Sequence, residues 1–488
     1  MTYPAQQPMP ALRRSAPFAR PIKILQFGQG AFLRGFFDWQ IDLLNERCGL
    51  DAGVVVVRPR GGSATPLLDV QDGLFTVLVR GLDEHGENVK ACRLVECVQR
   101  EIDPSTAAMY AELLAQAANP DLRLIVSNTT EAGIAVNDSD AFDDAPPASF
   151  PAKLTRLLYA RYQAFDGALE KGVILLPCEL IDDNGPALKA AVLHVAGRWQ
   201  LGAGFAHWLD RACTFCSTLV DRIVTGYPAD AAAQVEAELG FSDRFMVAAE
   251  QYYQFVIEGP ASLADELKLH DAKLNIVLVD DIKPYKKRKV GILNGGHTTL
   301  VPVALLAGLE SVGQAVDDGE VGAWLAAAID HEIIPALEMD VTELQAFAAA
   351  VLLRFRNPSI HHRLASIALN SWSKFAARVM PQLLRFAALN GGRLPPRLVL
   401  SLAATMVLYR GSVIELADDP AHVRWFADAW GRVVTGDMSL RALAEGWLAN
   451  SALWGRDLNA VAGLTTALAE ALGRVTRDGM RQALRDQL

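Results

Sequence analysis

The chain is long enough for two domains, and its charge suits no nucleic acid partner. Its 488 residues exceed what one hydrophobic core usually serves, and hydrophobic residues at 51% with charged residues at 21% form an ordinary globular balance. A formal net charge of -10 supplies no basic field for a nucleic acid backbone, although a small anionic substrate can still bind in a local basic pocket.

The first 20 residues look like a lead into the fold. Residues 1–20 contain four prolines and the pair Arg13-Arg14, with no apolar run behind that pair. We expect a flexible N-terminal lead over 1–20 and not a signal peptide. No stretch of the chain reaches ~18 consecutive apolar residues, so the sequence also predicts no membrane span.

The first half of the chain alternates short apolar runs with helical patterns. The runs are nearly continuous and rich in β-branched residues, which is typical of strands covered on both faces. Amphipathic stretches such as 111–118 lie between several of them. We therefore predict a Rossmann-like, doubly wound, mostly parallel α/β domain over 21–284. Its expected strands are 22–27, 54–58, 122–128, 172–179 and 274–281.

Strand 22–27 runs directly into a partial dinucleotide-binding motif. The motif reads Gly28-Gln29-Gly30-Ala31-Phe32-Leu33-Arg34-Gly35. Gly28 permits a tight turn, and Gly30 lets backbone N–H groups approach a pyrophosphate at the start of a helix. Leu33 stands where the motif asks for a third glycine, but the strand-turn-helix context still favours dinucleotide binding. The residues expected at the cofactor here are Ile24, Phe27, Gly28, Gln29, Gly30, Ala31 and Phe32.

The tip of the second strand carries Arg58-Pro59-Arg60, where an NAD site usually has an acidic residue for the ribose hydroxyls. Arg58 could contact the cofactor by binding a 2′-phosphate, which would indicate NADP. It could equally belong to a solvated surface pair. The spacing leaves both interpretations open.

The cysteines and histidines do not form a metal-binding pattern. Of the six scattered cysteines, only Cys213 and Cys216 form a CxxC pair. No second pair and no nearby His pair completes a tetrahedral zinc site, and the adjacent His361 and His362 would point to different faces of a helix. We expect reduced, mostly buried thiols, no metal and a reducing, cytoplasmic compartment.

The segment from Lys289 to Thr298 carries the strongest chemical signal. If a helix begins near residue 286, a 100° step puts Lys289, His297 and Asn294 at about 0°, 80° and 140° on one arc. An amide that polarises a carbonyl, an imidazole that holds a hydroxyl and an ammonium that delivers a proton together suit carbonyl reduction. The alternative is a solvated basic turn followed by structural His and Asn residues. Gly291, Gly295 and Gly296 would each weaken a helix, which indicates that close packing or a ligand requires glycine there.

After about residue 290, alanine and leucine dominate and the apolar pattern becomes helical. We predict an all-α domain over 285–488, in which Asp340 with Glu343 resembles a capping box. The expected helices are 320–337, 341–354, 360–390, 396–416 and 440–448.

The spacing Lys289-x4-Asn294-x2-His297-Thr298 resembles the signature of the long-chain polyol dehydrogenases, the mannitol dehydrogenase family. GQGAFLRGFFDWQ at 28–40 resembles the family's cofactor turn, and SNTTEAG at 127–133 its nicotinamide-side strand end. The resemblance covers nearly the whole chain. It continues through the segments 177–185, 217–228, 255–260 and 354–370.

The resemblance implies roles that the residues alone do not establish. It implies a nicotinamide cofactor, NAD with NADP not excluded, which Asn128, Thr129 and Thr130 would contact. It makes Lys289 the general acid/base, and Asn294 with Asn184 the oxyanion ligands. It also makes His297, Asp221 and Lys374 substrate ligands. Without it, Asp221 beside Arg222 is more readily an ion pair, and Asn184-Gly185 an ordinary turn.

Departures from the family pattern point to a sugar acid. Polyol-specific members tend to carry Arg and His where this chain has Ser366 and Leu369, and an acid where it has Lys286. A more cationic neighbourhood fits a small-molecule sugar acid better than a neutral polyol. The alternatives are a polyol dehydrogenase, a zinc dehydrogenase and a non-catalytic nucleotide-binding protein. The sequence does not determine the hexuronate epimer or the oligomeric state.

Overall fold

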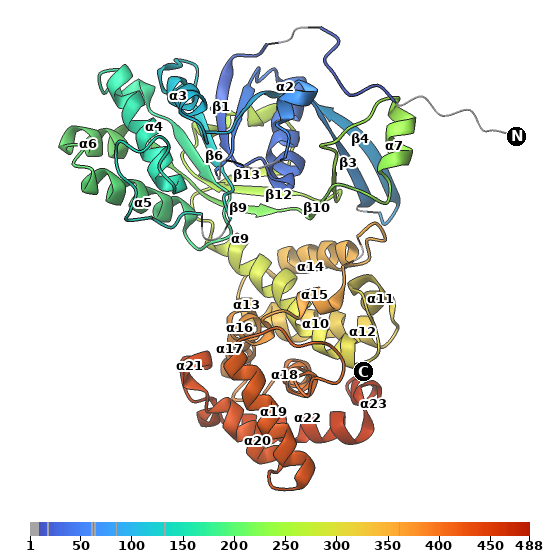
Figure 1. Ribbon diagram of the computed structural model, residues 1–488. Helices are drawn as coiled ribbons and strands as arrows, with labels where there is room; N and C mark the ends of the chain where they lie inside the picture. The colour runs from blue at the N-terminus through green and yellow to red at the C-terminus, as the bar shows by residue number, and fades with distance from the viewer. Residues whose placement is uncertain are drawn as a thin grey trace, which may run out of the picture. The chain divides into compact units, whose positions relative to one another are not determined.

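The computed structural model describes residues 9–16, 19–59, 62, 65–83, 85–130, 133–360 and 362–488. The chain forms two compact units, coloured mainly blue to green and yellow to red in Figure 1. The first unit comprises Met1–Arg80 and Asn88–Ile282, and the second comprises Gly81–Glu87 and Lys283–Leu488. The short segment Gly81–Glu87 thus belongs to the helical unit, which the sequence did not predict. Much of the expected lead, Arg60 and His361 lie outside the described residues.

The described part of the N-terminal lead is bound to the first unit. Leu12 is buried, and its N–H donates to the carbonyl of Ser242 at 3.0 Å. The Arg14 backbone N–H donates to the Asp72 carboxylate at 3.0 Å. Residues 12–14 are thus anchored, where the sequence predicted a flexible segment.

A six-stranded parallel sheet forms the centre of the first unit. Its order is β5-β2-β1-β6-β7-β8, and every pair in it is parallel. Counted in chain order within this sheet, the strands run 3-2-1-4-5-6, the order of dinucleotide-binding folds. The strands are β1 (Ile22–Phe27), β2 (Gly53–Val57), β5 (Val98–Ile102), β6 (Leu124–Ser127), β7 (Ile174–Pro177) and β8 (Thr214–Phe215).

Both faces of this sheet are covered, as the continuous apolar runs predicted. Successive β1 residues go to opposite faces, so that Ile24 joins one buried cluster and Leu25 another. The fold prediction of a doubly wound Rossmann-like domain is confirmed. The helices of at least eight residues in this unit are α2 (Trp39–Cys48), α3 (Ala107–Ala115), α4 (Phe150–Ala164), α5 (Asn184–Arg198), α6 (Ala203–Ala212) and α7 (Ala232–Leu239).

Two smaller sheets complete the first unit, and the sequence did not anticipate them. The four-stranded sheet has the order β10-β11-β3-β4 and the three-stranded sheet the order β13-β12-β9. The strand expected at 274–281 belongs to the second of these, so it is a strand but not part of the large parallel sheet. The strands are β3 (Phe75–Leu82), β4 (Asn88–Val95), β9 (Ser217–Asp221), β10 (Val224–Gly226), β11 (Val247–Ala249), β12 (Gln254–Glu258) and β13 (Ile276–Val279).

The second unit is built of helices around one large buried cluster. Helix α18 is buried on every side from Leu398 to Leu408 and packs against α10 and α22. The main helices are α9 (Lys283–Arg288), α10 (Gly295–Leu306), α12 (Val321–Ala328), α14 (Val341–Phe355), α16 (Ser371–Arg378), α17 (Met380–Leu389), α18 (Pro396–Leu408), α19 (Pro420–Thr435), α20 (Leu440–Leu448) and α22 (Leu464–Asp478). Shorter ones are α11 (Val312–Asp317), α13 (Ile334–Leu337), α15 (Leu364–Ile367), α21 (Ser451–Trp454) and α23 (Met480–Arg485).

The helix ends show where local signals succeeded and failed. Asp340 accepts a hydrogen bond from the Glu343 N–H at 2.9 Å, so it caps α14 as predicted. The stretch 360–390 is not one helix but α15, α16 and α17, because Asn370 has a left-handed φ of 52° and Pro381 starts a new helix. The segment 396–416 is helical only to Leu408. No helix in the described ranges is long and apolar enough to span a bilayer.

Candidate active site

The turn after β1 is shaped for close backbone approach. Gly28 has a φ of +134°, and a Cβ atom there would lie 2.9 Å from the backbone oxygen of Asn128. The N–H of Gly28 donates to the Val57 carbonyl at 2.9 Å. Gly30 precedes the helix, and a Cβ atom on it would meet nothing within 4 Å. Glycine is therefore required at 28 by geometry, whereas Gly30 leaves open space in front of the turn.

The missing third glycine of the motif is found two residues later. The helix after the turn consists of α1 (Ala31–Leu33), a π-helical turn η1 (Arg34–Asp38) and α2. A Cβ atom on Gly35 would lie 2.9 Å from Val224 of β10, so Gly35 permits the close helix–strand packing usually assigned to the third position. This contact is with the four-stranded sheet that contains β10 and not with β1 of the parallel sheet.

The remaining predicted cofactor positions gather around this turn. Ile24 and Phe27 are buried in β1, whereas Gln29, Ala31 and Phe32 are half-buried at its exit. The N–H of Asn128, directly after β6, donates to the Phe27 carbonyl at 3.0 Å. The ends of β1 and β6 therefore lie side by side, as neighbouring parallel strands require.

A buried glutamate holds the end of β6 in shape. The Glu179 carboxylate accepts hydrogen bonds from the Ser127 hydroxyl at 3.0 Å and from the Thr129 N–H and hydroxyl at 3.0 and 2.9 Å. Burial raises the pKa of Glu179, and the bonds from Thr129 oppose that rise. Thr130 follows with a φ of 80°, which is unusual for a β-branched residue. Sequence reasoning missed Glu179, although the segment 177–185 had drawn attention for its resemblance.

Arg58 is committed to the fold and not to a phosphate. Its side chain is buried, and its Nε atom donates to the Glu101 carboxylate at 2.7 Å. Its terminal nitrogens donate to the carbonyls of Thr65 at 3.0 Å and Pro66 at 2.8 Å. Both interpretations of Arg58, a 2′-phosphate ligand and a solvated pair, are therefore corrected. The guanidinium ties the loop after β2 to β5, and it supplies no argument for NADP.

Asn184 is also engaged by the protein itself. Its side-chain amide donates to the carbonyls of Pro177 at 2.9 Å and Thr218 at 3.1 Å, and its oxygen accepts from the Thr218 N–H at 2.9 Å. An amide nitrogen has two hydrogens, so little donor capacity is left for an oxyanion. In the structure Asn184 joins β7, β9 and α5, and its role as an oxyanion ligand stays a prediction.

Asp221 lies buried at the end of β9, paired in register with Gln254 of β12. The neighbouring Arg222 donates to the carbonyls of Gly35 at 2.7 Å and Glu250 at 2.9 Å, and its guanidinium lies 4.1 Å from the Trp39 ring centroid. Its hydrogen bonds are thus with backbone carbonyls and not with the Asp221 carboxylate that the sequence suggested as its partner.

In the second unit, a π turn begins at Lys289. The turn η6 (Lys289–Asn294) separates α9 from α10, and the Gly295 N–H bonds to the Val290 carbonyl five residues earlier. In such a turn, residues five apart stack on the same face, so Asn294 lies above Lys289. His297 follows Asn294 by three residues within α10, again on the same face. A uniform 100° step therefore does not apply across this segment, because Lys289–Asn294 is π-helical.

Tertiary packing explains the glycines of this segment. A Cβ atom on Gly291 would lie 2.7 Å from the Leu337 side chain, and one on Gly295 would lie 3.4 Å from the backbone oxygen of Arg378. A Cβ atom on Gly296 would make only an ordinary contact, at 3.5 Å, with Ile329. At Gly291, therefore, the missing side chain allows Leu337 to approach the π turn, and at Gly295 the backbone of Arg378 lies within van der Waals contact.

His297 lies among rings and cations with one polar atom unmatched. Its ring stacks on Phe355 at a centroid distance of 4.0 Å and meets His362 edge-on at 5.2 Å. Its Nε2 atom is buried and has no hydrogen-bond partner among the described residues. Burial lowers the pKa of His297 well below its ordinary value, and positive charge on His362, Arg354, Arg378 and Lys374 adds to that effect. The imidazole is therefore neutral at pH 7, with an unmatched nitrogen of the kind that a ligand satisfies.

Lys374 is half-buried on α16, where its Nζ atom donates to the Ile367 carbonyl at 2.9 Å. Burial and the charge of Arg378 lower the pKa of Lys374, whereas Asp418 raises it. Since Lys374 acts electrostatically on His297, the structure brings these two predicted residues together. Sequence reasoning missed their neighbours Phe355, His362 and Arg378, although the first two lie in the segment 354–370 that carried the resemblance.

The CxxC pair is not a redox or metal site. Cys213 and Cys216 are both buried but belong to the two clusters on opposite faces of the parallel sheet. Burial raises the pKa of each thiol to about 12. The interpretation as buried, reduced thiols is confirmed. Across the described ranges, no group of His, Cys, Asp and Glu side chains is arranged to hold a metal ion.

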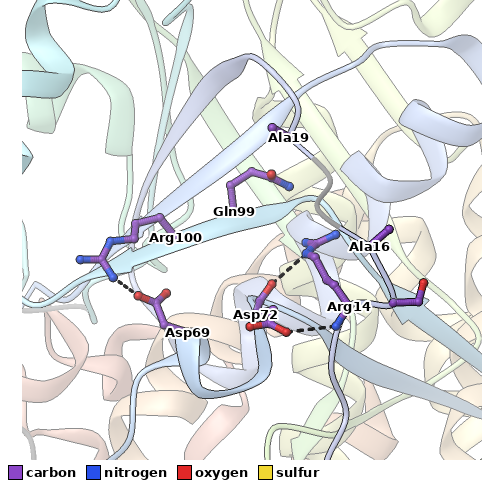
Figure 2. Close-up of a pocket in the computed structure, with 8 residues that line it drawn as sticks. Arg14, Ala16, Ala19, Asp69, Asp72, Gln99 and Arg100 are labelled. Carbon is purple, nitrogen blue, oxygen red and sulfur yellow. Dashed lines mark hydrogen bonds and ion pairs between the residues drawn. The ribbon is translucent and has the colours of Figure 1, made fainter.

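A surface pocket of about 650 Å³ lies elsewhere in the first unit, between the N-terminal segment and β5 (Figure 2). It is lined by Arg14, Ser15, Ala16, Ala19, Asp69, Asp72, Gln99 and Arg100. Its acidic residues are already paired, Asp72 with Arg14 and Asp69 with Arg100. No predicted site residue lines this pocket, so we assign it no role in the chemistry.

Two family models match the chain and together cover most of it. The mannitol dehydrogenase Rossmann domain matches residues 22–271, and the mannitol dehydrogenase C-terminal domain matches residues 281–476. Among curated relatives, the altronate oxidoreductase of Yersinia enterocolitica is 52% identical over 470 residues, covering 96% of this chain and 97% of that protein. The altronate oxidoreductase of Cronobacter sakazakii is 52% identical over 477 residues, covering 97% and 98%.

Solved structures show the same fold at low sequence identity. The mannitol 2-dehydrogenase of Pseudomonas fluorescens, in a ternary complex with NAD and D-mannitol, aligns with a TM-score of 0.69 at 22% identity, covering 99% of this chain and 97% of that chain. A substrate-free D-sorbitol dehydrogenase aligns with a TM-score of 0.79 at 19% identity, covering 98% of each chain.

Proposed function

Because the chain belongs to the mannitol dehydrogenase family, we propose that it is an NAD-dependent oxidoreductase that reduces D-tagaturonate reversibly to D-altronate. The observation that carries this proposal is its similarity to altronate oxidoreductases, at 52% identity over 96% of the chain. The chemistry of the described residues supports it at three points: the cofactor turn, the proton donor and the charge around the substrate residues.

The turn after β1 fits a dinucleotide. Gly28 supplies the left-handed backbone, and Gly30 leaves space in front of the helix start, where N–H groups favour phosphate. Residues 128–130 line the adjacent strand end. NADH, when bound, supplies the hydride for the reduction. NAD is preferred over NADP because Arg58, the residue that suggested a 2′-phosphate, is buried in an ion pair with Glu101.

The π turn carries the two residues that donate a proton or a hydrogen bond to the substrate carbonyl oxygen, Lys289 and Asn294. Lys289 in its ammonium form donates a proton to the oxygen as the carbonyl becomes a hydroxyl, and in the oxidative direction its amine takes that proton back. Asn294, stacked above Lys289, donates an amide hydrogen to the same oxygen as negative charge develops there. The neutral His297 satisfies its unmatched Nε2 by bonding to a substrate hydroxyl, without adding charge.

The charges around His297 favour an acidic substrate. Arg354, Lys374 and Arg378 all act on the pKa of His297 in the same direction, and they are among the largest causes of its shift. A uronate carboxylate would balance the charge of Arg378, whereas a neutral polyol would leave that charge without a counter-ion. Free thiols at all six cysteines support a reducing compartment, and we propose the cytoplasm.

The proposal is tested with a substrate panel. The purified protein is assayed with D-tagaturonate, D-fructuronate and D-fructose, each with NADH and with NADPH. We expect kcat/KM to be highest for D-tagaturonate with NADH. Higher kcat/KM on D-fructuronate would make the protein a fructuronate reductase, and comparable rates on D-fructose would favour a mannitol 2-dehydrogenase activity. A preference for NADPH would overturn the cofactor assignment.

A further inference from the structure

Arg378 at the end of α16 is half-buried and has no acidic partner. Among the described residues, no carboxylate or carbonyl forms an ion pair or hydrogen bond with its guanidinium. Burial alone lowers its pKa. Other half-buried arginines behave differently, since Arg397 pairs with Glu332 at 3.3 Å and Arg93 with Asp42 at 2.7 Å. A partly desolvated guanidinium without a counter-charge is costly unless an anion occupies the position.

The backbone places Arg378 against the residues expected to do the chemistry. Helix α16 packs on both α10 and the π turn η6. A Cβ atom on Gly295 would lie 3.4 Å from the Arg378 backbone oxygen, so the chain at Arg378 lies against the residue that follows Asn294.

Arg378 also shares a helix face with a predicted substrate ligand. It follows Lys374 by four residues, the spacing at which helical side chains are neighbours. The charges of both residues act on the pKa of His297, so both cations lie within electrostatic reach of the same imidazole. The Lys374 Nζ atom already has the Ile367 carbonyl as an acceptor, whereas the guanidinium of Arg378 keeps its planar, two-pronged donor set for a ligand.

We propose that Arg378 binds the carboxylate of the hexuronate substrate, next to Lys374, and thereby sets the preference for sugar acids over uncharged ketoses. This inference rests on the proposed function and deepens it. A guanidinium recognises a carboxylate through two parallel N–H···O bonds, which a substrate with a terminal hydroxymethyl group cannot replace.

The test compares two substrates that differ only at the end that Arg378 would read. D-tagaturonate carries a carboxylate where D-tagatose carries a hydroxymethyl group. Wild type, Arg378→Gln and Arg378→Lys are assayed on both with NADH. The control is Arg385→Gln on the neighbouring helix α17, because Arg385 is exposed and pairs with Glu338 at 2.6 Å.

We expect Arg378→Gln to lower the ratio of kcat/KM for D-tagaturonate to that for D-tagatose by about 10- to 100-fold, mainly through KM. Arg378→Lys should give an intermediate ratio, and the control should keep the wild-type ratio. An unchanged ratio in Arg378→Gln, or equal losses on both substrates, would overturn the inference. Thermal melting of each variant separates a folding defect from a change in recognition.

A second measurement separates this inference from the proposed function. Calorimetry with D-altronate and NADH measures binding without turnover, because both molecules are already reduced. If wild type binds D-altronate but does not reduce D-tagaturonate, the proposed function fails, and weaker binding by Arg378→Gln still supports the inference. Equal affinity of wild type and Arg378→Gln overturns it whatever the turnover, and no binding by either protein overturns both proposals.

Discussion

Several polar residues near the strand ends of the first unit form hydrogen bonds within the protein, whereas two polar groups around the π turn of the second unit do not. Arg58, Asn184 and Thr129 are bonded to carboxylates and carbonyls of the protein itself. In the second unit, the Nε2 atom of His297 and the guanidinium of Arg378 have no hydrogen-bond or ion-pair partner in the described part of the chain. A sequence motif can contain both bonded and unbonded polar residues. Only the hydrogen-bond partners seen in the structure distinguish a residue that stabilises the fold from one that can bind a ligand.

The difference has an energetic consequence. Removing a paired buried group leaves its partners unsatisfied and therefore costs folding free energy. Removing an unmatched group leaves nothing behind, so its loss should appear in turnover or binding and not in stability. Substitutions of the bonded residues should thus lower stability, whereas substitutions of the unbonded residues should lower turnover or substrate binding.

The largest expected effect is on turnover. Lys289→Ala should lower kcat by about 10²- to 10⁴-fold, because the proton donor is lost. Lys287→Ala is the matched control, since Lys287 is an exposed lysine on the adjacent helix α9. NADH oxidation with D-tagaturonate measures the rate. Unchanged kcat in Lys289→Ala would remove the catalytic assignment and favour a protein that only binds nucleotides.

The next effect is on stability and lies in the first unit. Arg58→Met should lower the free energy of unfolding by about 3 to 5 kcal/mol, because Glu101 is left buried without its counter-charge. Denaturant unfolding measures this loss. The ratio of kcat/KM with NADH to that with NADPH should stay within about twofold of wild type. A large shift of that ratio toward NADH would mean that Arg58 does contact a 2′-phosphate.

A matched pair of asparagines tests the comparison directly. Asn184→Ala should lower the free energy of unfolding by about 2 to 3 kcal/mol, because its bonds to Pro177 and Thr218 are lost. Asn294→Ala should leave stability nearly unchanged and lower kcat by about 10²-fold, through loss of a donor to the oxyanion. Melting temperatures and kcat are measured for both. The reverse pattern would exchange the two roles.

The smallest effect is on the pH dependence of stability. The pKa of His297 is lowered in the folded protein, so below the unfolded value near 6.5 the unfolded chain binds more protons. Stability should therefore fall as pH drops from 7 toward 5, by at most about 1.4 kcal/mol per pH unit for one proton. In His297→Gln, unfolding at several pH values should show a shallower fall. The exposed His207→Gln should behave like wild type, and identical slopes in His297→Gln and wild type would contradict the prediction.

The regular elements were predictable where local pattern and packing agree. Strand β1 lies at 22–27 and helix α20 at 440–448, as expected, because a continuous β-branched run and a 3.6-residue apolar period each match the burial that the fold requires. The three-residue strands β10 and β11 gave no such pattern. Strands this short exist only because long-range partners hold them, so no local window reveals them.

In the candidate site, too, local spacing could be read from the sequence, whereas features that depend on tertiary packing could not. The spacing of Lys289, Asn294 and His297 was enough to place three chemically suitable groups on one arc. The π turn that brings Asn294 above Lys289 was not readable, because it depends on where Leu337 packs against Gly291. The same holds for Arg378, whose significance lies in the partners that it lacks.

By itself, the sequence determined the order of the elements, the two-domain character and the residue types available for hydride and proton transfer. Those properties follow from periodicity, turn residues and short spacings, which are local. Tertiary structure alone decided which polar side chains are free to act. Hydrogen-bond partners such as Glu101 for Arg58 and Thr218 for Asn184 lie more than thirty residues away along the chain, and a buried polar group is structural or functional according to whether such a distant partner is present.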